Sequence, residues 1–236
     1  MKKIAIVPFR FERYKETPVF EYLTSAGWEV CPVVGASSIF EAFSNTIKEK
    51  DIRANDKIIL CHDDIKIISN PQHFNETLDY YFEKDPSVGF LGVAGTTELN
   101  SNAIWWEGAS NPHPESRDKL SGMVIHGSTQ KEYYYTYFGP LRKVAVLDGV
   151  FLATKGSVLH SIQTKKPKSF KGDWDFYDLF YTTQATLKNL NNYTVPIQIA
   201  HESYGNTAGK ESWHQNRASF QEMYSFKFPI KVTSTQ

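Results

Sequence analysis

Acidic and histidine side chains follow two apolar segments of this sequence, in positions where they can bind a metal ion. His62, Asp63 and Asp64 come directly after one such segment, and His201 comes directly after another. Neighbouring carboxylates repel each other unless a cation or hydrogen-bond donors neutralise them. Carboxylate oxygens suit Mg²⁺ and Mn²⁺, so Asp64 and His201 can share one divalent ion that bridges to a diphosphate. The alternative is that Asp63 or Asp64 caps a helix that follows.

A further acid lies inside an apolar run. Asp148 and Gly149 interrupt residues 142–154, which are otherwise mostly apolar. An unpaired charge in such surroundings is costly, so Asp148 is expected to have a partner. Gly149 has no side chain, and it therefore permits the close approach of either a ligand or another backbone segment.

Acidic residues also alternate with aromatic ones between residues 173 and 178, where a helix is predicted to begin. Asp175 and Asp178 are candidates for a general base, next to flat aromatic side chains on which a sugar can stack. The alternative is that Asp173 or Asp175 caps the N-terminus of the helix. Capping uses one acid, so it leaves two others without an explanation.

The sequence lacks the motifs of several other enzyme classes. Neither GxGxxG nor GxxxxGK[ST] follows the first predicted strand, which argues against dinucleotide-binding oxidoreductases and P-loop NTPases. No GxSxG elbow is present, as a serine hydrolase of that type would need. Cys31 and Cys61 lie in apolar segments and are predicted to be buried thiols, neither nucleophilic nor disulfide-bonded.

The composition is that of an ordinary globular protein. The 236 residues include 26 Lys and Arg against 26 Asp and Glu, so the formal net charge is zero. A neutral chain gives little support to a nucleic-acid or anionic-membrane partner, because both usually require an excess of basic residues. The N-terminal segment lacks the long apolar stretch of a signal peptide, and no segment is apolar enough for a membrane span. We therefore expect a cytoplasmic, soluble protein without a membrane span.

Short apolar segments alternate with amphipathic ones over residues 1–95. The segments with continuous apolar character predict strands that are buried on both faces. These strands cover residues 4–8, 28–34, 57–61 and 88–94. Apolar residues at helical spacing predict helices over residues 19–26, 39–47 and 74–82. The alternation of strands and helices indicates an α/β protein with a mostly parallel sheet.

The second half has a less regular pattern. Residues 96–141 are rich in Asn, Gly, Ser, Pro and Tyr, and they are expected to form a functional excursion or a short hairpin with loops. Further along, a helix is predicted over residues 175–190, a strand over 195–200 and a helix over 213–224. Both halves of the chain are expected to form a single domain.

The order of these motifs resembles that of GT-A-fold glycosyltransferases, in particular the small family-2-like group with the StrF-type domain of streptomycin biosynthesis and small viral and bacterial sugar transferases. The resemblance covers residues 3–205. It rests on Val7-Pro8-Phe9-Arg10, Phe43-Ser44-Asn45, His62-Asp63-Asp64, Gly89 to Gly95, Leu147-Asp148-Gly149, Phe176-Tyr177-Asp178 and His201, in that order. It implies a single domain with a mixed, mostly parallel sheet flanked by helices.

The resemblance also implies different functions for three successive segments of the chain. Residues 1–95 would be the nucleotide-binding half, 96–205 the half for the donor sugar and acceptor, and 206–236 a C-terminal tail with a helix. In such enzymes an acidic motif of DxD type holds a divalent metal against the donor diphosphate. Carried over, Asp64 and His201 would bind Mn²⁺ or Mg²⁺. The implied donor- and nucleotide-binding residues are Pro8, Arg10, Asn45, His62, Asp63, Asp148 and Gly149.

The activity implied is metal-dependent transfer of a sugar from a nucleotide-diphosphate sugar, with a UDP-sugar favoured, to an acceptor hydroxyl with inversion. The base in relatives lies in a Tyr-Asp-hydrophobic-Asp pattern. Tyr177-Asp178-Leu179 fits this pattern, whereas Phe180 replaces the second acid, so Asp178 is favoured over Asp175.

Two alternatives remain open at this point. A non-catalytic nucleotide-sugar-binding module is favoured by the departures at His62 and Phe180. A nucleotidyltransferase usually has a glycine- and basic-rich loop after the first strand, and residues 8–13 contain no glycine.

Overall fold

Seven strands form the central sheet, in the order β10–β13–β5–β12–β3–β1–β2. The computed structural model describes residues 1–110, 117–128, 131–203 and 209–232. The strands are β1 (Lys3–Phe9), β2 (Glu29–Val34), β3 (Lys57–Cys61), β5 (Val88–Gly92), β10 (Lys143–Val144), β12 (Phe151–Lys155) and β13 (Asn191–Thr194). β1 is parallel to β2 and β3, and β13 is parallel to β5, whereas β12 runs antiparallel between β3 and β5. The predicted mixed, mostly parallel sheet is confirmed.

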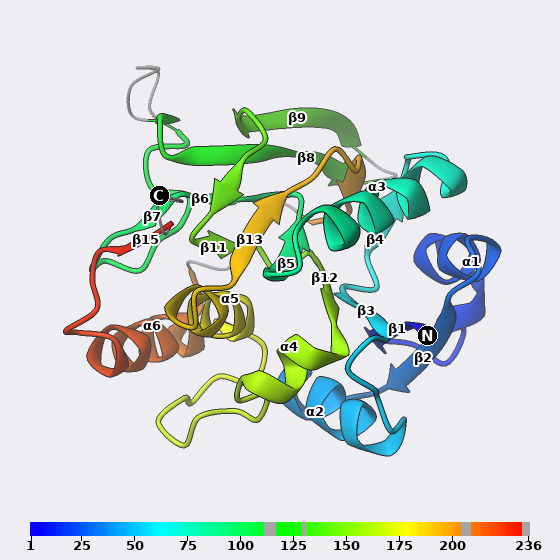
Figure 1. Cartoon of the computed structure of the whole chain (residues 1–236), viewed down its shortest axis with the longest axis horizontal. Coiled ribbons are helices and arrows are strands. Elements are labelled where there is room, and N and C mark those ends of the chain that lie inside the picture. Colours follow the sequence, from blue (N-terminus) through cyan, green and yellow to red (C-terminus); the bar gives the residue numbers. More distant parts are fainter. Residues whose placement is uncertain (111–116, 129–130, 204–208, 233–236) are drawn as a thin grey trace.

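Helices flank this sheet (Figure 1). They are η1 (Tyr14–Glu16), α1 (Pro18–Ser25), α2 (Ile39–Glu49), α3 (Pro71–Lys84), α4 (Gly156–Ser161), α5 (Tyr177–Leu187) and α6 (Glu211–Met223). The predicted helix starts have local causes. Thr17 and Asn70 accept backbone N–H groups at the N-termini of α1 and α3, and each is followed by proline at the first helical position.

Six further strands form a second sheet. Its order is β11–β6–β8–β14–β4, with β9 paired to β8. The strands are β4 (Ile65–Ile67), β6 (Ala94–Thr96), β8 (Leu120–Ser128), β9 (Lys131–Gly139), β11 (Val146–Leu147) and β14 (Ile199–His201). A small antiparallel pair, β7 (Glu98–Leu99) with β15 (Ile230–Lys231), ties the C-terminal part of the described chain to this region.

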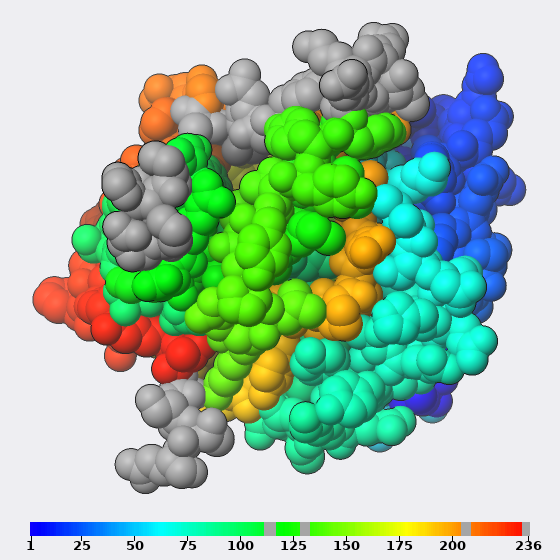
Figure 2. All heavy atoms as spheres, turned by 90° about the horizontal axis from the view of Figure 1, so that it is seen from above, coloured from blue at the N-terminus to red at the C-terminus, as the bar shows by residue number. Residues whose placement is uncertain are grey.

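The expected excursion over residues 96–141 contains the longest strands of the structure. β8 and β9 have nine residues each and pair antiparallel, so the hairpin is longer than expected. Seen from above, the green hairpin crosses the face of the molecule between the red C-terminal part and the cyan and blue N-terminal part (Figure 2). Residues 111–116 and 129–130 of the expected excursion, and residues 206–208 and 233–236 of the expected tail, lie outside the described residues.

The predicted strand over residues 195–200 is confirmed only at its C-terminal end, where β14 begins at Ile199 in the second sheet. Residues 195–198 belong to no strand and connect β14 to β13, which ends at Thr194 in the central sheet. Pro196 between them has no N–H to donate, and Ile197 N donates to Val195 O in a tight turn. The chain therefore bends there, and this bend carries His201 toward the end of β3.

One continuous apolar core runs under both sheets, as expected for a single domain. Cys31 and Cys61 are buried free thiols, as predicted, and burial raises the pKa of each thiol. Among the described residues, no helix combines the length and the apolar composition that crossing a bilayer requires.

Candidate active site

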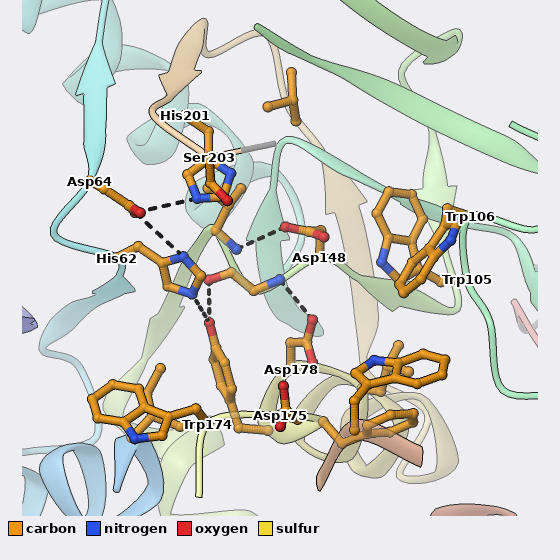
Figure 3. Close-up of a pocket in the computed structure, with 18 of the residues that line it drawn as sticks. His62, Asp64, Trp105, Trp106, Asp148, Trp174, Asp175, Asp178, His201 and Ser203 are labelled. Atoms are coloured by element: carbon orange, nitrogen blue, oxygen red, sulfur yellow. Dashed lines mark hydrogen bonds and ion pairs between the residues drawn. The ribbon is translucent and has the colours of Figure 1, made fainter. Parts of the chain in front are cut away.

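The strand ends and the start of α5 surround a cavity of about 420 Å³ (Figure 3). Every residue that the sequence analysis selected as a site residue lines this cavity, with the exception of Asn45. The lining residues among those selected are Pro8, Arg10, His62, Asp63, Asp64, Asp148, Gly149, Asp175, Asp178 and His201. They are spread over almost two hundred positions of sequence, and the fold brings them to one edge of the central sheet.

Asn45 is not brought to this cavity. Its side chain is exposed on α2 and lines a separate hollow between β2 and α2. The buried face of α2 is formed by Phe40, Phe43 and Thr46, at spacings of three. Asn45 lies off this face, because residues two positions apart on a helix point in different directions.

Arg10 neutralises the paired carboxylates that follow β3. Since β1 and β3 are parallel neighbours, their carboxyl ends lie together. Arg10 Nη2 lies 2.9 Å from Asp63 Oδ1 and 3.3 Å from Asp64 Oδ2, and the Arg10 backbone N–H donates to Asp63 Oδ2 at 2.9 Å. A strand, β4, begins directly after Asp64, so the helix-capping alternative for these two acids is wrong. Ion pairs with Arg10 instead hold both carboxylates at the strand end.

His62, Asp64 and His201 form a cluster whose ligand atoms all lie within 4.8 Å of one another. β14 pairs with β4, with His201 opposite Ile65, which places His201 beside Asp64. Asp64 Oδ1 lies 3.3 Å from His201 Nε2 and 3.8 Å from His62 Nδ1. This buried oxygen nevertheless accepts no hydrogen bond from the described residues. A buried acceptor without a partner is costly, and a cation would satisfy it.

The protonation states of this cluster suit metal binding. Burial opposes ionisation of Asp64, but His201, His62 and Arg10 more than offset this, and the pKa of Asp64 lies well below its usual value. Burial and the neighbouring His201 lower the pKa of His62. At neutral pH Asp64 is therefore a carboxylate and His62 a neutral imidazole, which are the forms that ligate metals.

Tyr177 determines which nitrogen of His62 carries the proton. The phenol oxygen of Tyr177 lies 2.8 Å from His62 Nε2 and donates to Gly149 O at 2.6 Å. Burial and the charge of Asp178 raise the pKa of Tyr177 well above its usual value, so the phenol keeps its single proton. Gly149 O can only accept, and the phenol proton is therefore used there. His62 Nε2 must then be the donor to Tyr177, and His62 Nδ1 presents its lone pair toward Asp64.

Asp178 lies in the first turn of α5, beside the Asp148–Gly149 turn. Gly149 N donates to Asp178 Oδ2 at 2.9 Å, and Val150 N donates to Asp148 Oδ1 at 2.9 Å. A side chain at Gly149 would collide with the phenol of Tyr177, which explains the glycine. Burial and the charge of Asp148 raise the pKa of Asp178 to about 7. A carboxylate with a pKa near neutrality is suited to proton transfer.

Asp175 makes structural contacts. It is buried, its Oδ2 accepts from Ser212 Oγ at 2.9 Å, and its backbone oxygen accepts from Asn216 Nδ2 at 3.0 Å. The residue at the N-cap of α5 is Phe176, with no side-chain capping hydrogen bond. The alternative that Asp175 caps this helix is therefore wrong. It is also wrong for Asp173, whose carboxylate pairs with Lys166 at 2.6 Å.

Several cavity residues were not selected from the sequence. His126 on β8 lines the cavity, stacks on Tyr134 at 5.5 Å between ring centroids, and has a buried Nδ1 without a partner among the described residues. Phe138 on β9 and Trp213 on α6 also line it. The alternation of Val124 and His126 toward the cavity is a strand signal, but it has meaning only once β8 is known to be a strand.

The fold is of the GT-A type. Residues 21–224 match a family described as "Glycosyltransferase like family", and the chain belongs to that family. No curated protein sequence matches the chain.

Two of the solved structures that share the fold illustrate the similarity. A197 from STIV has 13% identity and a TM-score of 0.50, over 86% of each chain. GalNAc-T7 with UDP, GalNAc and Mn²⁺ has 7% identity and a TM-score of 0.54, over 95% of this chain and 48% of that chain. This chain thus spans about half the length of the GalNAc-T7 chain.

Proposed function

We propose that the protein is a metal-dependent, inverting glycosyltransferase that moves a sugar from a nucleotide-diphosphate sugar to an acceptor hydroxyl. The observation that carries the proposal is the joint placement of Asp178 and the His62–Asp64–His201 cluster on one cavity. A nucleotide-binding edge, a candidate metal site and a candidate base are the three parts that this reaction needs. A UDP-sugar is the favoured donor, since the GalNAc-T7 structure of the same fold contains UDP.

The residues present fit a divalent cation. His62 Nδ1, Asp64 Oδ1 and a nitrogen of His201 would hold it, and Asp64 Oδ1 has no other partner among the described residues. Two imidazoles with one carboxylate favour Mn²⁺ over Mg²⁺, because Mg²⁺ prefers oxygen ligands throughout. When bound, the cation would supply positive charge against the leaving diphosphate.

The remaining steps belong to residues of the chain. Arg10 keeps its guanidinium partly exposed, with 57% of its side chain accessible, and can contact the nucleotide phosphates from the strand end. Asp178 accepts the proton of the acceptor hydroxyl at its carboxylate, and Gly149 N–H holds that carboxylate in place. The hydroxyl then attacks the anomeric carbon from the face opposite the leaving group, in a single inverting displacement.

The experiment that tests the proposal is incubation with UDP- and GDP-sugars and candidate acceptors, with Mn²⁺ or with a chelator. We expect release of the nucleoside diphosphate with Mn²⁺ and none with the chelator. Nucleotide binding without release would instead indicate a non-catalytic binding module. Formation of a nucleotide-sugar from a nucleoside triphosphate and a sugar phosphate, detected by product mass, would indicate a nucleotidyltransferase.

A further inference from the structure

The cavity has two ends of different chemistry. The polar end contains Arg10, Asp63 and the His62–Asp64–His201 cluster. The opposite side is lined by large apolar rings, which we call the aromatic end: Trp105, Trp106, Phe138, Phe176 and Trp213. Figure 3 shows Trp105 and Trp106 on the side of Asp148 and Asp178, away from Asp64 and His201. The candidate base therefore lies between the polar end and the aromatic end.

The rings of the aromatic end form one connected wall. Centroids are separated by 5.0 Å for Phe138 and Trp105, 5.7 Å for Trp105 and Trp106, 5.8 Å for Trp106 and Trp213, and 5.4 Å for Trp213 and Phe176. These rings come from the turn at residues 105–106, from β9, from α6 and from the residue before α5. Because each ring packs on the next, the wall is rigid, and Trp106 is its partly exposed member.

Two features of this wall point to a ligand. Phe176 has φ of 68°, a left-handed conformation that is unfavourable for a bulky residue and that clusters at functional sites. Trp105 is only 4% exposed, and its indole N–H has no acceptor among the described residues. A ligand oxygen would provide the missing acceptor, since buried donors are almost always paired.

The charges near the aromatic end limit what can bind there. Asp148, Asp175 and Asp178 all line the cavity on this side and form no ion pair with a described cation, and they outnumber the one lysine of the lining, Lys210. An acceptor that carries a phosphate or a carboxylate would be repelled by them. A neutral molecule with many hydroxyls would instead find both hydrogen-bond acceptors and flat apolar surface.

We propose that the aromatic end is the acceptor subsite and that it takes a neutral saccharide ring. The C–H face of the ring packs on Trp106, and a hydroxyl at its rim faces Asp178. The assignment as an acceptor subsite rests on the proposed function, whereas saccharide binding at the aromatic end does not. The excess of carboxylates on this side disfavours a lipid-linked phosphate carrier and an acidic sugar.

The binding test is a ligand-observed NMR titration of the purified protein without donor. The neutral probes are the methyl glycosides of glucose, galactose and N-acetylglucosamine, and the anionic probes are glucuronate and glucose 1-phosphate. We expect at least one neutral probe to bind and both anionic probes to bind more weakly. Trp106→Ala should weaken the neutral probe about tenfold, which corresponds to one aromatic contact.

Two variants keep this test decisive. Trp106→Phe retains a ring and should bind nearly as well as the wild type, which separates a stacking role from general damage. Tyr135→Ala removes an exposed ring, 69% accessible, from the other face of β9 and should change nothing. Equal binding by Trp106→Ala and the wild type, or stronger binding of the anionic probes, would overturn the proposal.

A transfer assay separates this inference from the proposed function. With a UDP-sugar and Mn²⁺, Trp106→Ala should raise the KM for the neutral acceptor about tenfold while the affinity for UDP stays unchanged. If the wild type releases UDP but transfers to no neutral saccharide, the acceptor assignment is wrong and the proposed function stands. If the wild type releases no UDP at all, the proposed function fails, and the NMR titration alone decides on saccharide binding.

Discussion

The polar and aromatic ends of the cavity have opposite effects on the pKa of a carboxylate. At the polar end, Asp64 lies against Arg10 and two imidazoles, which hold its pKa well below the usual value, so this carboxylate remains ionised. Near the aromatic end, Asp178 has only backbone N–H donors and another acid beside it, and its pKa rises to about 7. The same side-chain type thus carries a fixed charge at one end and can take up a proton near neutral pH at the other.

A single hydroxyl joins the two ends. The Tyr177 phenol contacts His62 of the polar end and Gly149 O, and the Gly149 N–H in turn holds Asp178. The candidate metal ligand and the candidate base are therefore positioned by one turn and one helix start. Substitutions at the two ends can therefore be distinguished by the property that stays unchanged, which is metal binding in one case and proton transfer in the other.

The largest expected effect comes from removing the proton acceptor. Asp178→Asn keeps the size of the side chain and its contact with Gly149 N–H, so the fold should survive. We expect transfer to fall by about a hundredfold to ten-thousandfold, while UDP and Mn²⁺ bind as in the wild type. Steady-state kinetics and calorimetry measure the two properties separately.

Asp175→Asn is the matched control, three residues away. Its carboxylate contacts Ser212, so we expect some loss of stability but a far smaller loss of transfer than in Asp178→Asn. Should Asp175→Asn lose transfer and Asp178→Asn keep it, the base would be Asp175. Full transfer in both variants would contradict the inverting scheme.

A second large effect is expected at the polar end. Asp64→Ala removes the proposed metal ligand. Loss of a direct ligand should weaken binding more than loss of a residue that only orients a ligand, so we expect Mn²⁺ affinity to fall by at least about a hundredfold. Calorimetry of UDP binding with and without Mn²⁺ measures it. Asp173→Ala, which removes an acid that pairs with Lys166 away from the cavity, is the control and should bind Mn²⁺ normally. Equal Mn²⁺ affinity in Asp64→Ala and the wild type would rule out the site.

The difference between the two ends also predicts a pH dependence. With its pKa raised to about 7, Asp178 is protonated below that pH and cannot accept a proton. Turnover should therefore fall about tenfold for each pH unit below 7 and level off above it. The rate profile between pH 5.5 and 8.5 checks this, together with UDP affinity at the same pH values. A rate that does not change across pH 7 while binding is constant would contradict the assignment of Asp178.

The smallest expected effect tests the link between the ends. Tyr177→Phe removes only the hydroxyl that accepts from His62, so the His62 tautomer is no longer fixed. Mn²⁺ affinity should fall by about tenfold, and the ¹⁵N shifts of His62 should change from one tautomer to a mixture. Tyr181→Phe is the control, since that buried hydroxyl on the same helix donates to Thr164 O outside the cavity. Unchanged ¹⁵N shifts in Tyr177→Phe would show that another contact fixes the ring.

Much of the polar end can be predicted from the sequence because its parts are local. A continuous apolar segment such as residues 57–61 can only be satisfied inside a covered sheet, and polar residues that follow it must then lie at a strand end. The rule that parallel strands share a carboxyl edge brings Arg10 to the same edge as Asp63 and Asp64, and the pairing of β1 with β3 in the folded sheet makes them neighbours. This rule does not place Asn45, because the way α2 packs on the sheet decides which face of that helix is buried.

The aromatic end is a product of tertiary structure. Phe138 and His126 belong to a hairpin whose polar, irregular sequence shows no clear period, and Trp213 comes from a helix near the end of the chain. Which of their faces meets the cavity depends on pairings between residues far apart in sequence, such as β14 with β8 and β15 with β7. Local patterns determined most strands and helices of residues 1–95, the helices that contain Asp178 and Trp213, and the strand-end acids of this protein. Only long-range packing decided the position of the Tyr177 hydroxyl between His62 and Gly149 and the formation of the aromatic wall, because these depend on contacts that no local pattern encodes.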